Sequence, residues 1–200
     1  MYPFPPYFST INFDYGFEGN VLVSEGTAYN TGIELTIEKF FSKGYHFLVN
    51  GTLYDSKYTN YVGEEYDTKY NGSYAAKGLF IKEFKVGAHK QNLISIGTRC
   101  IYMGGMRYLP IDLEASLANN SEVKIWDDGF TEKANDFFRI DLQFSVTRNK
   151  PKYTGEWSLD IINITNQKNV RWRRYNNSIR AIETEYQNPL IPLLTYRIKF

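Results

Sequence analysis

The sequence predicts an all-β fold: an antiparallel up-and-down sheet of about seven strands with long external loops, forming part of a transmembrane β-barrel. Three observations predict it. Apolar and polar residues alternate repeatedly along the chain, whereas helical periodicity is nearly absent. The connections between the alternating segments are short and long in turn. Aromatic residues make up 17% of the chain, with 17 Tyr and 14 Phe, and such rings are typical of membrane interfaces.

The alternating segments define the strands. The clearest is residues 138–147, which alternate without a break over about the length that one tilted membrane strand requires. Residues 74–86 alternate less regularly and are assigned as a strand mainly by position. A hairpin is expected over residues 170–187, beyond the membrane. The predicted strands are residues 28–41, 45–58, 74–86, 92–104, 137–148, 155–168 and 190–200.

The connections indicate a membrane barrel. Residues 42–44, 87–91 and 149–154 form short turns, whereas residues 60–72, 104–135 and 167–189 form long loops. An up-and-down sheet places alternate connections at opposite ends, so one end carries every short turn and the other every long loop. Outer-membrane barrels have this asymmetry, with short turns on the periplasmic side. A soluble up-and-down barrel has no physical reason to keep it.

Seven strands predict a piece of a larger barrel. An antiparallel sheet closes only with an even number of strands, and unpaired edges in lipid cost several kcal/mol for each backbone group. An eighth strand within residues 1–25 is weakly supported, because Pro3, Pro5 and Pro6 do not suit a paired strand. Residues 1–9 lack the features of a secretory signal, so either the protein is cytosolic or an N-terminal part is missing.

Four segments and the chain end carry a family resemblance. They are Ser24–Leu35, Ser56–Thr59, Gly104–Asp112, Asp160–Asn166 and the terminal Tyr196–Phe200. In this order and spacing the chain resembles the C-terminal third of the barrel of TonB-dependent outer-membrane receptors. The resemblance covers residues 24–200; residues 1–200 contain no plug domain and no TonB-contacting segment. A family barrel has about three times as many strands, so the chain resembles a fragment that does not transport alone.

The resemblance implies a role and partners. The role is that of a receptor or transporter component for energised nutrient uptake at the outer membrane of a Gram-negative cell. The partners are outer-membrane lipid, the rest of the barrel and its plug, the TonB system through the missing N-terminal part, and an unknown small ligand. Residues facing the lumen and the external loops would shape the ligand path. The candidates here are Arg107, Tyr108, Trp126, Arg139 and Asp141.

The C-terminus carries a second candidate function. Leu194, Tyr196, Ile198 and Phe200 share one face of the last predicted strand, and they resemble the signal read by the barrel-insertion machinery. Phe200 is therefore expected to act in insertion and not in ligand binding. The alternative is that Phe200 is an ordinary aromatic residue of the membrane interface.

Other functions are less well supported. No catalytic constellation, glycine-rich phosphate loop or metal-ligand spacing occurs, so we expect no enzyme activity and no cofactor. A net charge of +1 gives no indication of nucleic-acid binding. Two alternative classes remain: a small outer-membrane barrel with a structural or adhesion role, and a soluble lipocalin-like barrel with its apolar face inward.

Three local patterns allow two interpretations each, and a fourth predicts a helix. Residues 126–130 fit a calcium loop or, more simply, a polar turn. His46 and His89 fit metal ligands or, more simply, ordinary histidines. Residues 171–174, Arg-Trp-Arg-Arg, fit a phosphate-binding cluster or a solvated loop face. Residues 110–119 have a faint helical pattern that predicts a short loop helix.

Overall fold

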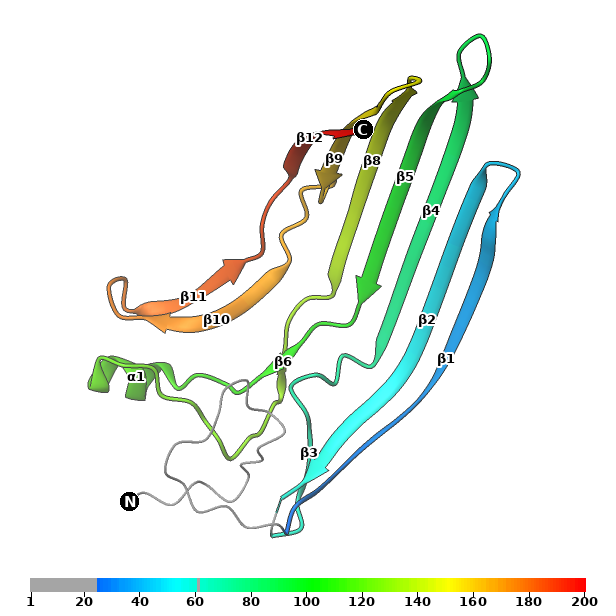
Figure 1. Cartoon of the computed structure of the whole chain (residues 1–200). Coiled ribbons are helices and arrows are strands. Elements are labelled where there is room, and N and C mark those ends of the chain that lie inside the picture. Colours follow the sequence, from blue (N-terminus) through cyan, green and yellow to red (C-terminus); the bar gives the residue numbers. More distant parts are fainter. Residues whose placement is uncertain (1–24, 61) are drawn as a thin grey trace.

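The computed structural model describes residues 25–60 and 62–200, so the weak N-terminal strand considered for residues 1–25 lies almost wholly outside the described part. Seven long strands form one antiparallel meander, in which each strand pairs with the next along the chain (Figure 1). The all-β prediction is confirmed at this level. The strands are β1 (Thr27–Ser42), β2 (Tyr45–Thr59), β4 (Tyr74–Val86), β5 (Asn92–Met103), β8 (Phe137–Asn149), β9 (Thr154–Ile162) and β12 (Ile191–Lys199).

The remaining elements lie beyond one end of the sheet, the loop end, at the bottom of Figure 1. β3 (Glu65–Asp67) extends the pairing of β2, β6 (Arg107–Tyr108) pairs with β7 (Glu132–Lys133), and β10 (Val170–Asn176) pairs with β11 (Ala181–Tyr186). The predicted loop helix is α1 (Leu113–Asn119), which Asp112 caps through its side chain. Among the described residues, no helix has the length and apolar character needed to cross a bilayer.

The opposite end of the sheet, the turn end, carries the short connections. Lys43 and Gly44 join β1 to β2 with φ angles of 52° and 73°, the left-handed conformations that a tight two-residue hairpin requires. The turns between β4 and β5 and between β8 and β9 lie at the same end (Figure 1). The predicted segregation of short turns from long loops is therefore present.

One predicted strand is too long. Residues 155–168 were expected to be extended, but β9 ends at Ile162. Asn163 and Asn166 then take left-handed conformations, with φ angles of 54° and 51°. The Asn163 side chain accepts a hydrogen bond from the backbone N–H of Gln167 at 3.1 Å and so closes a local turn. Asparagine tolerates this conformation and bonds its own backbone, which ends a strand.

The strand register gathers the apolar residues on one face. In the pairing of β5 with β8, Ile96 lies opposite Phe144 and Cys100 opposite Ile140. The same pattern continues across all seven strands. Many large side chains on this apolar face are more than a third exposed: Tyr29, Ile33, Leu35, Ile37, Val49, Leu53, Phe80, Phe84, Ile96, Tyr102, Leu142, Phe144, Trp157, Leu159, Leu194, Tyr196 and Ile198.

The described residues have almost no apolar core. Among them, only Tyr58, Leu109 and Tyr175 are buried hydrophobic residues, and all three belong to the loop end. Within residues 25–60 and 62–200, no protein layer therefore covers the apolar face in the middle of the sheet.

The other face of the sheet is polar and internally paired. Arg99 donates from Nε to Asp141 at 2.9 Å, and Gln143 donates to Asp160 at 2.7 Å. Asn50 donates to Glu34 at 2.7 Å. Each of these contacts joins neighbouring strands, so the face is held by cross-strand pairs.

The sheet is open within the described residues, because its hydrogen-bonded path runs from β1 to β12 without joining these two strands. Both edge strands run from the loop end to the turn end (Figure 1). The expectation that seven strands leave the sheet unclosed is confirmed.

Candidate ligand site at the loop end

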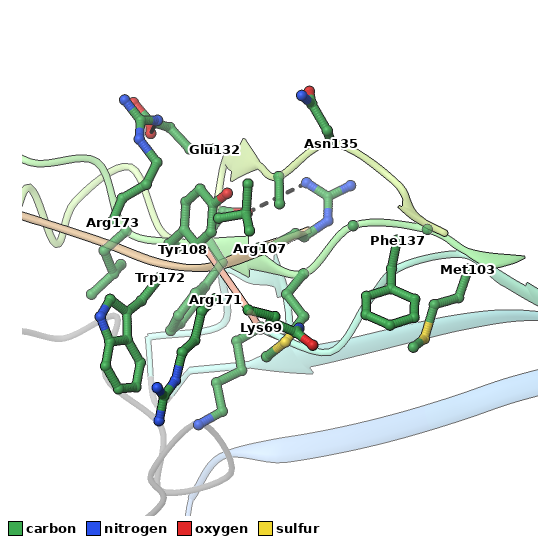
Figure 2. A pocket seen from close by; sticks show the side chains of 18 of the residues that line it. Lys69, Met103, Arg107, Tyr108, Glu132, Asn135, Phe137, Arg171, Trp172 and Arg173 are labelled. Atoms are coloured by element: carbon green, nitrogen blue, oxygen red, sulfur yellow. Dashed lines mark hydrogen bonds and ion pairs between the residues drawn. The ribbon is translucent and has the colours of Figure 1, made fainter. Parts of the chain in front are cut away.

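A cavity of about 760 Å³ lies on the polar face, where β5 and β8 meet the loops (Figure 2). Ile101, Met103, Phe137 and Arg139 form its floor at the ends of these strands. Its walls come from the β6–β7 segment and from the β10 hairpin strand. Its volume lies within the ~300–1,000 Å³ of typical ligand pockets.

Arg107, the first predicted ligand-path residue, ties the walls together. Its Nε donates to the Asn71 carbonyl at 3.0 Å, and its Nη1 donates to the Phe130 carbonyl at 3.3 Å. Its Nη2 lies 3.1 Å from an Asp67 carboxylate oxygen. The planar guanidinium therefore joins two loops. Arg107 lines the cavity, but its N–H donors are bound to protein groups of these loops.

Glycines beside Arg107 allow the loop backbones to touch. A Cβ on Gly104 would clash with the carbonyl of Gly72, and a Cβ on Gly105 would clash with the carbonyl of Ala134. Close backbone approach of this kind requires glycine. The Gly104–Asp112 segment thus positions the cavity wall.

Tyr108, Trp126 and Arg139 are brought to the same cavity from three separate segments. Burial raises the pKa of the Tyr108 phenol above its ordinary value of 10.0, so its hydroxyl stays protonated and can donate or accept a hydrogen bond. Arg139 places Nε 3.1 Å from Asp141. Of the five predicted ligand-path residues, these three thus join Arg107 in lining one cavity.

Asp141 lies next to this cavity and not in it. It is 8% exposed, accepts from the Asn163 backbone N–H at 2.9 Å and lines a second cavity of about 300 Å³ on the polar face. Its contacts to Arg99, Arg139 and Asn163 make it a structural junction of three segments.

Sequence reasoning missed the cavity residues Lys69 and Phe137, and it named Trp172 only within the 171–174 cluster and not as a ligand-path residue. The Trp172 indole N–H donates to Glu185 at 2.6 Å, and the guanidinium of Arg171 lies 4.2 Å from its ring centre. The position of Trp172 in the last long loop could have predicted its place at the cavity, because all long loops lie at the same end of the sheet.

The arginines of residues 171–174 pair with carboxylates. Arg173 lies 2.5 Å from Glu132, and Arg171 lies 3.4 Å from Glu185. Arg174 lies 3.7 Å from Glu185 as well. These pairs offset the cationic charge that the phosphate interpretation needs.

A cluster of polar tips lies on the opposite, apolar face at the loop end. The hydroxyls of Tyr74 and Tyr102 both donate to the Asp136 carboxylate, the second at 3.1 Å. The Gly105 backbone N–H also donates to it, at 3.3 Å. These hydrogen bonds, first of all that from Tyr74, hold the pKa of Asp136 below its ordinary value of 3.8.

Among residues 25–60 and 62–200, no group of three or more His, Cys, Asp or Glu side chains is arranged to hold a metal ion. Residues 126–129 form a turn, in which the Gly129 N–H donates to the Trp126 carbonyl at 3.1 Å. The His46 ring lies 3.2 Å from Glu38 across neighbouring strands.

The predicted assembly-signal residues lie on the last strand. Leu194, Tyr196 and Ile198 occupy the apolar face of β12, where the Tyr196 ring contacts Trp157 with ring centres 4.6 Å apart. Phe200 follows the end of β12 and is 97% exposed. Its role in insertion stays a prediction.

The chain is an all-β antiparallel sheet protein with one exposed apolar face and, at one end of its polar face, a cavity. Comparison of the chain with family models, curated proteins and solved structures finds no match in any of the three.

Proposed function

We propose that the chain forms part of the wall of a transmembrane β-barrel in the outer membrane of a Gram-negative cell. Within that class we propose the C-terminal barrel portion of a TonB-dependent receptor for nutrient uptake, which acts only with the rest of the barrel and its plug. The observation that carries the proposal is the continuous, uncovered apolar face of the seven-strand sheet.

The size of the apolar face argues for a lipid partner. Fully burying a large apolar side chain contributes about 1.5–3 kcal/mol, so each half-exposed one forfeits on the order of 1 kcal/mol in water. Summed over this face, the loss is comparable to the ~5–15 kcal/mol net stability of a whole domain. In a bilayer the same face needs no protein cover.

Aromatic residues flank the apolar face at both ends. On this face the loop end carries Tyr29, Tyr74, Tyr102 and Phe138, and the turn end carries Tyr45, Phe84, Trp157 and Tyr196. At the loop end, the hydroxyls of Tyr74 and Tyr102 point to Asp136 and so toward the loops. Aromatic rows with polar tips are typical of the two interfaces of a membrane barrel.

The two aromatic rows mark the limits of the apolar face and run obliquely across part of the sheet. At the loop end the limit moves from Tyr29 on β1 to Phe138 on β8, and at the turn end from Tyr45 on β2 to Tyr196 on β12. The loop-end limit moves toward the turns from β1 to β5 and is level from there to β8, whereas the turn-end limit moves only between β2 and β4 and is level from Phe84 to Tyr196. An oblique loop-end limit agrees with the tilted strands of membrane barrels.

The resemblance to TonB-dependent receptors supports the narrower part of the proposal. Two of its segments form the organising contacts of the loop end. Gly104–Asp112 supplies the close glycine contacts and the Arg107 clamp. Asp160–Asn166 supplies the buried turn at Asn163, which is 1% exposed.

Fluorescence quenching tests the lipid-facing assignment. The chain has three tryptophans; a Trp126→Phe/Trp172→Phe chain leaves Trp157 on the apolar face, and a Trp126→Phe/Trp157→Phe chain leaves Trp172 at the cavity. In micelles of a detergent with brominated acyl chains, we expect emission from Trp157 to be quenched several-fold more than emission from Trp172. Equal quenching, or a chain that stays monomeric and folded without detergent, would contradict the proposal.

A further inference from the structure

We propose that the 760 Å³ cavity binds an uncharged saccharide, with Trp172 as the surface on which a sugar ring stacks. The inference rests on the proposed function, because it names the class of ligand that the receptor would take up. Four properties of the cavity support it: a fixed indole, further aromatic residues, cations paired with carboxylates, and position in the fold.

Trp172 is held in place before any ligand arrives. Its N–H donates to Glu185 at 2.6 Å, and Arg171 lies over its ring at 4.2 Å. The side chain is nevertheless 42% exposed and lines the cavity (Figure 2). A fixed aromatic side chain that keeps exposed area loses little entropy when an apolar ring face stacks on it.

Further aromatic residues come from separate segments around the same space. Tyr108 lies on β6, Trp126 in the loop before β7, and Phe137 at the start of β8. Sugar rings present C–H faces with polar hydroxyls around the rim. A cavity of aromatic residues interleaved with polar groups suits both parts of such a ring.

Most cations on the cavity wall already lie beside a carboxylate. Five of its cations, Lys124, Arg107, Arg139, Arg171 and Arg173, each lie within 3.4 Å of a carboxylate. Lys69 lies 4.8 Å from the ring centre of Tyr70. An anionic ligand would have to compete with these carboxylates. A hydroxyl can donate to a carboxylate and accept from a guanidinium while both ion pairs stay in place.

The cavity is also in the right place for an uptake route. Ile101, Met103, Phe137 and Arg139 place its floor on the polar face at the loop end. In the proposed barrel this face lines the lumen, and the loop end faces the outside of the cell. A ligand held there would sit at the outer mouth of the lumen.

The Trp126→Phe/Trp157→Phe chain tests the inference with Trp172 as the single reporter. The chain is held in lauryldimethylamine oxide micelles, because detergents with sugar headgroups would compete. Maltohexaose and cellohexaose serve as neutral probes, and oligogalacturonate and glucose 6-phosphate as anionic ones. We expect a saturable change in Trp172 emission with at least one neutral probe and a weaker response to both anionic probes. A chain that retains only Trp157 should not respond.

A second variant tests the stacking role. In a Trp157→Phe/Trp172→Leu chain, Trp126 remains in the cavity as the reporter, and the introduced leucine keeps an apolar side chain on the hairpin. Compared with Trp157→Phe alone, we expect at least tenfold weaker saccharide binding. Unchanged affinity, no saturable response to either neutral probe, or tighter binding of an anionic probe would each overturn the inference. Quenching of Trp157 by brominated detergent reports separately on the barrel proposal.

Discussion

Through one guanidinium, Arg107 joins the connection between β2 and β4 to the segment just before β7. Its contacts to Asn71, Phe130 and Asp67 use the fork geometry that lysine lacks. We expect Arg107→Lys to weaken these contacts by about 1–2 kcal/mol, since the site is partly exposed and charged hydrogen bonds contribute about 1.5–3 kcal/mol when buried. Limited proteolysis should then cut residues 104–135 several-fold faster.

The matched control for Arg107 is Arg171→Lys. Arg171 pairs with Glu185 at 3.4 Å at an exposed position, with about half of its side chain accessible, and such surface pairs contribute little. The control should leave the cleavage rate of residues 104–135 unchanged. Equal effects of the two changes would show that Arg107 does not hold the loops.

Asp136 is expected to make the loop end sensitive to acid. Its folded-state pKa lies below the ordinary 3.8, chiefly because of the hydrogen bond from Tyr74. A depressed carboxyl pKa contributes stability that is present above the unfolded value and is lost as the pH falls through the folded value. Near-ultraviolet circular dichroism of the tyrosines should therefore show a transition below about pH 3.8.

Asp136→Asn removes the titrating group at this position. The variant should lack the acid transition and should already show a weaker tyrosine signal at neutral pH. A transition of the same amplitude and midpoint in both chains would assign it to another carboxylate.

At the scale of single strands, the two faces of β8 should respond differently to charge. Leu142 lies on the apolar face and Gln143 on the polar face, opposite Asp160. An arginine facing lipid near the middle of a membrane costs about 2–4 kcal/mol, so Leu142→Arg should lower the amount of folded, micelle-bound chain at least tenfold. Gln143→Arg should fold normally, because arginine can pair with Asp160. Similar yields of the two variants would argue against a lipid-facing side.

The long strands were predictable because each carries its own periodicity. Phe138 to Thr147 alternate without a break, and β8 covers all of them. Even residues 74–86, with weaker alternation, match β4, because the order of short and long connections leaves a strand only there. Local pattern and connection length are both properties of neighbouring residues and are therefore visible in a sequence.

The end of β9 was not predictable from alternation. The alternation of residues 155–162 gives no stop signal, and the strand ends at Asn163 because its side chain accepts from Gln167 while its backbone N–H donates to Asp141. The second contact joins residues that are 22 positions apart. Only the tertiary structure brings them together.

The cavity was predictable in part for the same reason. Arg107, Tyr108, Trp126 and Arg139 line it, in agreement with their assignment to the loop end. Trp172 was not assigned to the cavity, because its segment approaches β6 only through the packing of the hairpin. The Arg173 guanidinium, for example, lies 6.0 Å from the Tyr108 ring centre.

At the scale of the whole molecule, the two open edges restrict what can complete the sheet. β1 and β12 both run from the loop end to the turn end (Figure 1). Copies inserted in the same orientation would therefore place β12 beside β1 of the next copy in parallel. An antiparallel barrel requires a partner whose strands run the opposite way at both edges, and hence a partner with an odd number of strands. The remainder of a larger barrel meets this condition, and a ring of identical copies does not.

Cysteine cross-linking tests this restriction in micelles, where no common orientation is imposed. Two copies can then pair through the same edge strand, β1 with β1 or β12 with β12, in antiparallel fashion about a two-fold axis. Leu35 on β1 and Leu194 on β12 are 66% and 69% exposed, so Leu35→Cys and Leu194→Cys chains, each with Cys100→Ser, provide the probes. In an equal mixture we expect disulfides between two copies of the same variant to exceed mixed disulfides several-fold. A majority of mixed disulfides would mean that β1 and β12 pair in parallel, and a ring of copies could then close without any other partner.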